Sequence, residues 1–110
     1  MARYLTLALT NPVPGREQEY NDWYDNVALP VYSSIPGFKP LGRFKLADVP
    51  SMYPFQMKDQ WEYLSLYEFE TDDFAAFVEH VKTTLAVRSQ YYFCDAIDKT
   101  RFYEPVFVAL

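Results

Sequence analysis

The chain has 110 residues, of which half are apolar and 19% are aromatic, and its net charge is −5. This length is typical of one domain, and the apolar share is too high for a disordered or fibrous chain. Lysine and arginine are scattered rather than gathered into a basic stripe, which argues against binding to a nucleic acid. The aromatic content exceeds what so small a core can bury, so we expect a subunit interface or a ligand cavity.

Several other classes are excluded by what the chain lacks. Cys94 is the single cysteine, so no disulfide can form within the chain. No apolar run reaches the roughly 18–20 residues of a membrane span, and the N-terminus has no long apolar signal segment. One histidine, dispersed acids and three glycines supply neither a metal-ligand set nor a phosphate-binding loop. We therefore expect a cytoplasmic protein without metal, cofactor or membrane contact.

The first two elements follow from periodicity. Leucine alternates with other residues over 4–10, which predicts a strand with two different faces. Two prolines and Gly15 end that strand. A helix then begins at Arg16, and its aromatic face has helical spacing: Tyr20, Trp23, Tyr24 and Val27. Pro30 must interrupt or kink this helix, and Pro36-Gly37 ends its continuation.

Residues 38–47 predict a second strand. Three of its apolar residues are expected to lie in phase: Phe38, Phe44 and Leu46. Residues 48–60 then form a long connection that contains two prolines and several apolar side chains. Loops of this length often act as lids or binding loops, so we expect Tyr53 and Phe55 to help shape a pocket.

The second half of the chain repeats the pattern. Alternation over residues 61–70 predicts a third strand, and Thr71-Asp72-Asp73 supplies the N-cap of a second helix. The apolar residues of that helix share one face: Phe74, Phe77, Val78, Val81 and Leu85. A last strand is predicted for residues 102–110.

This order of elements, β-α-β-β-α-β over residues 1–110, predicts a single α+β domain with the ferredoxin-like arrangement. It builds a four-stranded antiparallel sheet with both helices on one face. We expect the other face to be exposed and aromatic, and therefore to pack against the sheet of a second copy. The predicted assembly is a homodimer.

Residues 21–30, Asn-Asp-Trp-Tyr-Asp-Asn-Val-Ala-Leu-Pro, resemble the first helix of the EthD-like proteins in the dimeric α+β barrel superfamily. Those proteins share an aromatic pair, a His-x-Pro turn and a Pro-Gly stop. Pro36-Gly37-Phe38 fits the stop, residues 67–73 fit the third strand and helix cap, and residues 95–98 fit a late turn. The resemblance spans most of the chain and implies a dimeric α+β barrel.

One position departs from the family pattern. Where the family places a histidine before Leu-Pro, this chain has Ala28. The family's histidine would point into the space between helix and sheet and act there as acid or base, which alanine cannot do. Either this protein naturally lacks the group and binds without that chemistry, or the chain is a variant inactivated by a His-to-Ala substitution.

The resemblance implies a cofactor-independent enzyme that transfers protons on a hydrophobic aromatic or polycyclic molecule, as a lyase, cyclase or isomerase. Cofactor-free oxygenation also occurs among relatives. The catalytic candidates are Ala28 (in place of the base), Tyr24 as acid/base partner or oxyanion donor, and Asp25 and Asn26 as orienting groups. The expected substrate-binding residues are Tyr20, Trp23, Tyr53, Phe55, Tyr67, Phe77, Val81 and Arg88.

Other interpretations stay open. The aromatic residues of the first helix could be ordinary core, and Asp25 and Asn26 a solvated helix end. His80 is expected to face solvent, because it lies off the apolar stripe of its helix. Arg88 could meet a ligand oxygen or extend to solvent. The main alternative function is a non-catalytic homodimer that binds an apolar ligand; a purely structural dimer would have no cavity.

Overall fold

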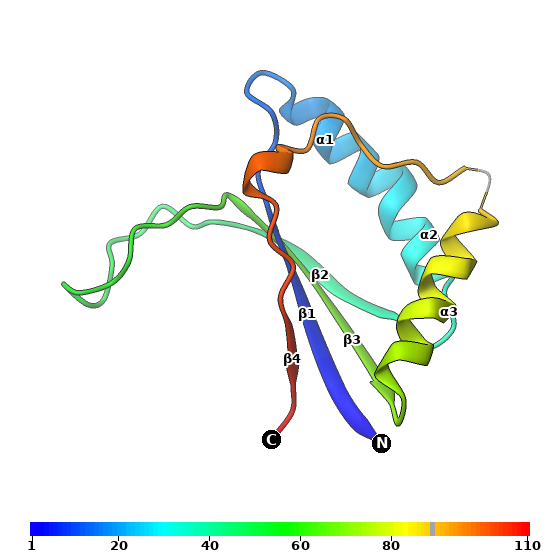
Figure 1. Ribbon diagram of the computed structural model, residues 1–110. Helices are drawn as coiled ribbons and strands as arrows, with labels where there is room; N and C mark the ends of the chain where they lie inside the picture. Colours follow the sequence, from blue (N-terminus) through cyan, green and yellow to red (C-terminus); the bar gives the residue numbers. More distant parts are fainter. Residues whose placement is uncertain (89) are drawn as a thin grey trace.

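A four-stranded antiparallel sheet in the order β2-β3-β1-β4 carries the fold, and its helices lie on one side of it (Figure 1). The computed structural model describes residues 1–88 and 90–110. The strands are β1 (Ala2–Thr10), β2 (Lys39–Lys45), β3 (Tyr63–Thr71) and β4 (Val106–Val108). The helical elements are α1 (Glu17–Trp23), the π-helical η1 (Tyr24–Ala28), α2 (Leu29–Ser33), α3 (Phe74–Ala86) and the 3₁₀-helical η2 (Lys99–Arg101). The predicted ferredoxin-like α+β fold is confirmed.

The two faces of the sheet differ as the alternation predicted. In β1 the buried residues are Thr6, Ala8 and Thr10, and in β3 they are Ser65, Tyr67 and Phe69. Both rows face the helices, because Tyr63 contacts Tyr20 of α1 and Phe69 contacts Phe77 of α3. The core therefore lies between one face of the sheet and the helical layer. In the part of the chain that is described, no helix is long and apolar enough to cross a membrane.

The first helix contains a π turn in its middle. The backbone N–H of Leu29 bonds to the carbonyl of Tyr24, five residues back, as in a π-helix. This wider turn brings both Tyr24 and Ala28 to the buried side. Pro30 falls in the first turn of α2, where a missing N–H costs least. The interruption predicted from Pro30 therefore takes the form of a π turn rather than a break.

A β-bulge in β2 overturns one sequence prediction. The pairing of β2 with β3 shifts between Pro40, which has no N–H to donate, and Gly42, whose φ of 145° favours glycine. The extra residue turns Phe38 toward the helices, where its ring stacks on Tyr67 with 5.0 Å between centroids. Phe44 then lies on the opposite face, in register with the leucines of β3. The prediction that Phe38 and Phe44 share a face is wrong.

The final strand is shorter than predicted. Only Val106–Val108 pairs regularly with β1, and Tyr103 forms an isolated bridge with Leu9. Pro105, which lies between them, cannot donate to the ladder, although its carbonyl accepts a bond of 3.1 Å from the N–H of Leu7. Residues 102–105 therefore run beside β1 as irregular chain rather than as strand.

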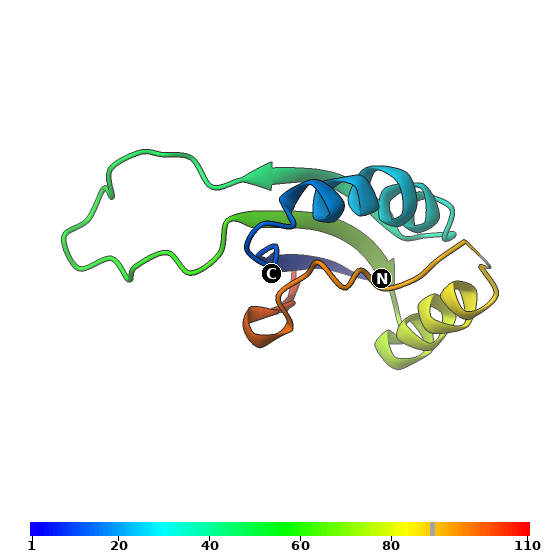
Figure 2. The ribbon, with the colours of Figure 1, turned by 90° about the horizontal axis from the view of Figure 1, so that it is seen from above.

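Residues 46–62 leave the body of the molecule as an extended loop (Figures 1 and 2). Its exposed apolar side chains are Val49, Met52, Tyr53, Phe55 and Met57. At its base, the indole N–H of Trp61 donates to the carbonyl of Arg101 at 2.6 Å. Because the loop points away from the helices, Tyr53 and Phe55 do not cover the space between helices and sheet in their own chain.

The face of the sheet that turns away from the helices is uncovered in the single chain. Its central leucines are only half-buried: Leu5, Leu7, Leu9, Leu64 and Leu66. Phe44 and Phe107, on the two edge strands, are 51% and 55% exposed. The prediction that this face is aromatic is wrong in its centre, because the larger rings of β1 and β3 point to the other side, where they span the gap to the helices.

The start of α3 allows a direct test of the predicted cap. The Asp73 carboxylate accepts a 3.1 Å hydrogen bond from the backbone N–H of Ala76. We expect Asp73→Ala to lower the free energy of unfolding by about 1 kcal/mol, because a helix N–H then loses its partner. Asp72→Ala is the control, since Asp72 makes only an exposed ion pair with the N-terminus. Equal losses in urea denaturation of the two variants would contradict the capping role.

Candidate functional site

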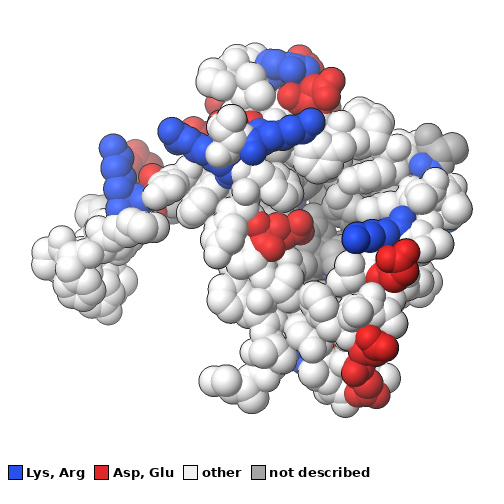
Figure 3. Space-filling view, viewed as in Figure 1, with Lys and Arg blue, Asp and Glu red and all other residues white. Residues whose placement is uncertain are grey.

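A cavity of about 190 Å³ lies between the sheet and α3. Four phenylalanines supply much of its wall, namely Phe38, Phe69, Phe74 and Phe77, and its two charged lining residues are Lys82 and Glu104. Figure 3 shows this face hollowed between the C-terminal segment and α3, with an acidic side chain on one rim and a basic side chain on the other. The cavity exists because α3 contacts the sheet through its first turns and leaves the rest of this face open.

The size of the cavity limits what it can hold. Sites for drug-sized ligands usually measure about 300–1,000 Å³, and this cavity measures about 190 Å³. An apolar cavity of about 150 Å³ is enough to bind benzene. The space therefore accommodates a molecule with a single aromatic ring.

Glu104 is a site residue that the sequence patterns did not identify. The residue as a whole is exposed, yet its carboxyl group is crowded by protein atoms at the cavity, and this burial raises the pKa of the carboxyl above the usual value for glutamic acid. The only hint in the sequence is an acidic residue within the apolar run 102–108. A carboxyl with a raised pKa beside an aromatic cavity is a candidate for proton transfer.

Two buried tyrosines lie within electrostatic range of that carboxyl. Burial raises the pKa of the hydroxyl groups of Tyr24 and Tyr67, and the negative charge of Glu104 adds to the rise in both. The hydroxyls of Thr10 and Ser65 offset part of this rise at Tyr24. Tyrosines with raised pKa values stay protonated at neutral pH. They can donate a hydrogen bond to a ligand oxygen, but they are poor bases.

Arg43 of β2 is a second residue that the sequence patterns did not connect to the site. Its guanidinium lies over the ring of Tyr24, 4.2 Å from the centroid, and donates to the side-chain oxygen of Asn21 at 2.9 Å. It also lies 3.6 Å from the carboxylate of Asp25, whose side chain is 64% exposed. Arg43 therefore helps to fix the position of the Tyr24 ring through a cation–π contact.

The π turn sorts the predicted catalytic residues into two groups. Tyr24 and Ala28 point into the protein, and Asp25 and Asn26 are exposed on its outer side. Ala28 is 0% exposed and belongs to a packed cluster with Trp23, Cys94, Ala96 and Ile97. Position 28 is thus closed off by packing.

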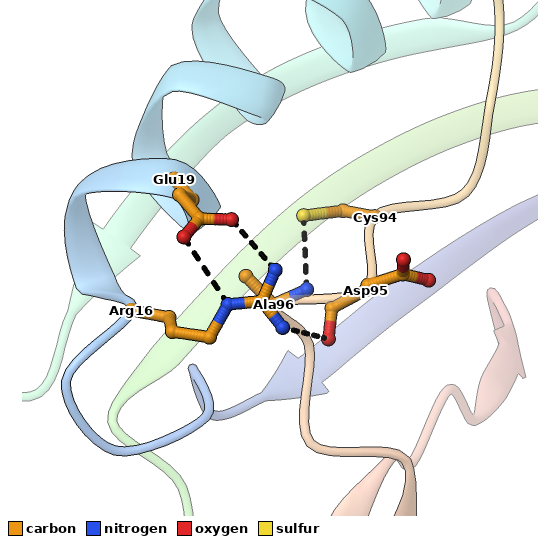
Figure 4. A network of polar contacts seen from close by, with 5 residues as sticks. All are labelled: Arg16, Glu19, Cys94, Asp95 and Ala96. Carbon is orange, nitrogen blue, oxygen red and sulfur yellow. Dashed lines mark hydrogen bonds and ion pairs between the residues drawn. The ribbon is translucent and has the colours of Figure 1, made fainter.

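A polar network joins the start of α1 to residues 94–96, and two of these residues, Cys94 and Ala96, belong to the same buried cluster as Ala28 (Figure 4). The Arg16 guanidinium donates to both carboxylate oxygens of Glu19, at 3.2 and 2.6 Å, and to the backbone carbonyl of Asp95 at 3.3 Å. The Ala96 N–H donates to the sulfur of Cys94 at 3.3 Å. These contacts tie residues 94–96 to the start of α1, so this part of the buried cluster is held by hydrogen bonds as well as by packing.

The predicted substrate-binding residues separate in the same way. Phe77 and Val81 line the cavity, and Tyr67 reaches it through its stacking on Phe38. The remaining five lie elsewhere. Tyr20 shares a buried hydrogen bond with Thr10, and the indole N–H of Trp23 donates to the backbone carbonyl of Tyr92. The rings of Tyr53 and Phe55 lie against each other in the extended loop. Arg88 lies beyond the end of α3.

Within residues 1–88 and 90–110, no three His, Cys, Asp or Glu side chains are grouped so as to hold an ion. His80 lies within 3.1 Å of the carbonyl of Pro36 and borders a different, outer hollow of α3.

No model of a known protein family matches this chain, and no curated protein matches it in sequence.

Proposed function

We propose that this chain is a cofactor-independent enzyme of the EthD-like dimeric α+β barrel type that transfers protons on a small hydrophobic aromatic molecule. The observation that carries the proposal is an aromatic cavity lined by Glu104, with two buried tyrosines, Tyr24 and Tyr67, within electrostatic range of that carboxyl. Phenylalanine rings bind an aromatic ring through apolar contact and stacking. Protonated tyrosines stabilise the negative oxygen that develops when a neighbouring carbon loses a proton. This chemistry fits an isomerase, cyclase or lyase.

The proposed working form is a homodimer in the cytoplasm. Its support is the uncovered leucine face, since two such faces packed together remove a large apolar surface from water. The extended loop 46–62 begins next to that face and carries its apolar side chains away from its own chain. In the proposed dimer this loop packs on the second copy, so that Tyr53 and Phe55 serve the partner rather than their own domain.

A second candidate function is a homodimer that binds an apolar ligand without chemistry. The packing at position 28 favours it, because Ala28 is fully enclosed and presents no base to the space between helix and sheet. Both functions require the cavity to bind a ligand. They differ in whether the bound ligand is changed.

A ligand panel separates the two functions. We expect single-ring aromatic ketones and phenols to raise the thermal unfolding temperature, since a ligand at about 100 times its Kd stabilises by about 2.7 kcal/mol. Polycyclic molecules should bind more weakly to a cavity of this size. Product formation, followed by mass spectrometry, indicates the enzyme, and binding without product indicates the binding protein.

A cavity-filling variant makes this test specific. Val81 lines the cavity, so Val81→Trp should abolish binding. Val87→Trp is the matched control, because Val87 follows the end of α3 and is 73% exposed. If both variants bind as the unaltered chain does, the ligand occupies another site and the proposal fails.

A further inference from the structure

We infer that Glu104 is the catalytic base of this site and takes the role that alanine leaves vacant at position 28. The inference rests on the proposed function and adds to it the group that accepts the proton. Glu104 lines the same cavity as Phe69 and Phe77, on the side of the C-terminal segment.

The backbone on both sides of Glu104 is tied to the central strand. Tyr103 and Leu9 exchange two backbone hydrogen bonds, of 2.8 and 3.1 Å, and the carbonyl of Pro105 accepts one of 3.1 Å from Leu7. The hydroxyl of Thr6 donates to the same carbonyl at 3.3 Å. A catalytic group works best when its support is rigid. These hydrogen bonds fix the backbone of residues 103–105 beside β1, and so they hold Glu104 at the cavity.

The surroundings suit a base of moderate strength. Lys82 of α3 lines the same cavity, and Tyr67 of β3 and Tyr24 of η1 lie within electrostatic range of the carboxyl. Burial raises the pKa of Glu104, which brings it closer to neutral pH and makes its carboxylate a stronger base than an exposed one. The two tyrosines keep their protons, so among these groups the carboxylate is the one that can take a proton from the ligand while they donate hydrogen bonds.

The step that we infer is a proton transfer from carbon. The ionised carboxylate of Glu104 removes a proton from a carbon next to a carbonyl of the bound ligand, and the electron pair of the broken C–H bond moves to the carbonyl oxygen. The carboxyl becomes neutral and the ligand becomes an enolate, so the site holds one negative charge throughout. The neutral carboxyl then returns the proton to the ligand, which needs no oxidant or reductant.

Hydrogen–deuterium exchange of acetophenone measures this step directly. Acetophenone has one ring and acidic methyl protons, and loss of its methyl signal in D₂O, followed by proton NMR, reports proton removal even if no product forms. We expect the unaltered chain to accelerate exchange and Glu104→Gln to lower the catalysed rate by about 100-fold or more. Glu104→Asp should keep part of the rate. Glu79→Gln on the outer side of α3 is the matched control and should exchange normally.

The pH dependence gives a second readout. The catalysed rate should rise with pH through one ionisation that lies above the usual range of glutamic acid, because burial raises that pKa and only the ionised form is a base. This rise should disappear in Glu104→Gln.

Three outcomes overturn parts of the proposal distinctly. Undiminished exchange in Glu104→Gln refutes the role of Glu104 and leaves the proposed function intact. Bound acetophenone, seen by ligand NMR, without accelerated exchange in the unaltered chain refutes both the base and the enzyme in favour of the binding protein. Absence of binding refutes the assignment of the cavity itself.

Discussion

Leu7→Lys is expected to convert the proposed homodimer into a monomer. Leu7 lies opposite Leu66 at the centre of the uncovered face, in the register of β1 with β3. A two-fold axis through this face brings each substituted side chain into the interface, so the dimer loses two leucine contacts and gains two buried positive charges. At about 2 kcal/mol or more for each chain, the dissociation constant should rise by about 1,000-fold.

Sedimentation velocity over a range of concentrations measures this change. Val87→Lys introduces the same charge at an exposed apolar position away from the sheet, and it should leave the dimer intact. Circular dichroism of both variants checks that the monomer stays folded. A dimer that survives Leu7→Lys shows that the leucine face is not the interface, and a monomeric unaltered chain refutes the homodimer.

Ala28→His is expected to destabilise the protein by about 1–3 kcal/mol, the usual cost of overpacking a core. Ala28 is 0% exposed and lies in a buried cluster with Cys94 and Ala96, whose segment is bonded to Arg16. For a domain of this size each kcal/mol lowers the Tm by roughly 4–8 °C. Asn26→His is the control, since Asn26 lies in the same π turn but is exposed. Urea denaturation and thermal unfolding measure the difference between the two.

Ala28→His also tests whether alanine is the natural residue at position 28 or replaces a histidine. If Ala28→His is destabilised and inactive, alanine fits this fold and proton transfer must come from another group, such as Glu104. If it is at least as stable as the unaltered chain and gains turnover, the position is suited to histidine and the chain is a disabled variant. These outcomes exclude each other, so one set of proteins decides between the two interpretations.

Local chain properties determined most of the fold in advance. The period of two in β1 and β3 separates the leucine row from the row that faces the helices, because a strand sends successive side chains to opposite sides. Asp73 was recognisable as a cap because its hydrogen bond closes within three residues. The helical spacing of apolar residues likewise placed Phe77 and Val81 on one face of α3, and both line the cavity between this helix and the sheet. Each of these features depends on neighbours along the chain.

Features that depend on distant parts of the chain were decided only in the tertiary structure. The bulge after Pro40 reverses the phase of Phe44 because β2 has to keep its pairing with β3. Glu104 meets the aromatic cavity because Pro105 and Tyr103 bond to β1 from far along the sequence. Arg43 reaches Tyr24 across the gap between sheet and helix.

The sequence by itself therefore determined the order of the elements, the two faces of the central strands and the absence of a histidine at position 28. It could not show that position 28 lies in a buried cluster with Cys94, Ala96 and Ile97, or that Glu104, near the C-terminus, lines the cavity. Those facts arise from contacts between residues far apart in the chain, and pattern and propensity report only on residues within a few positions of one another.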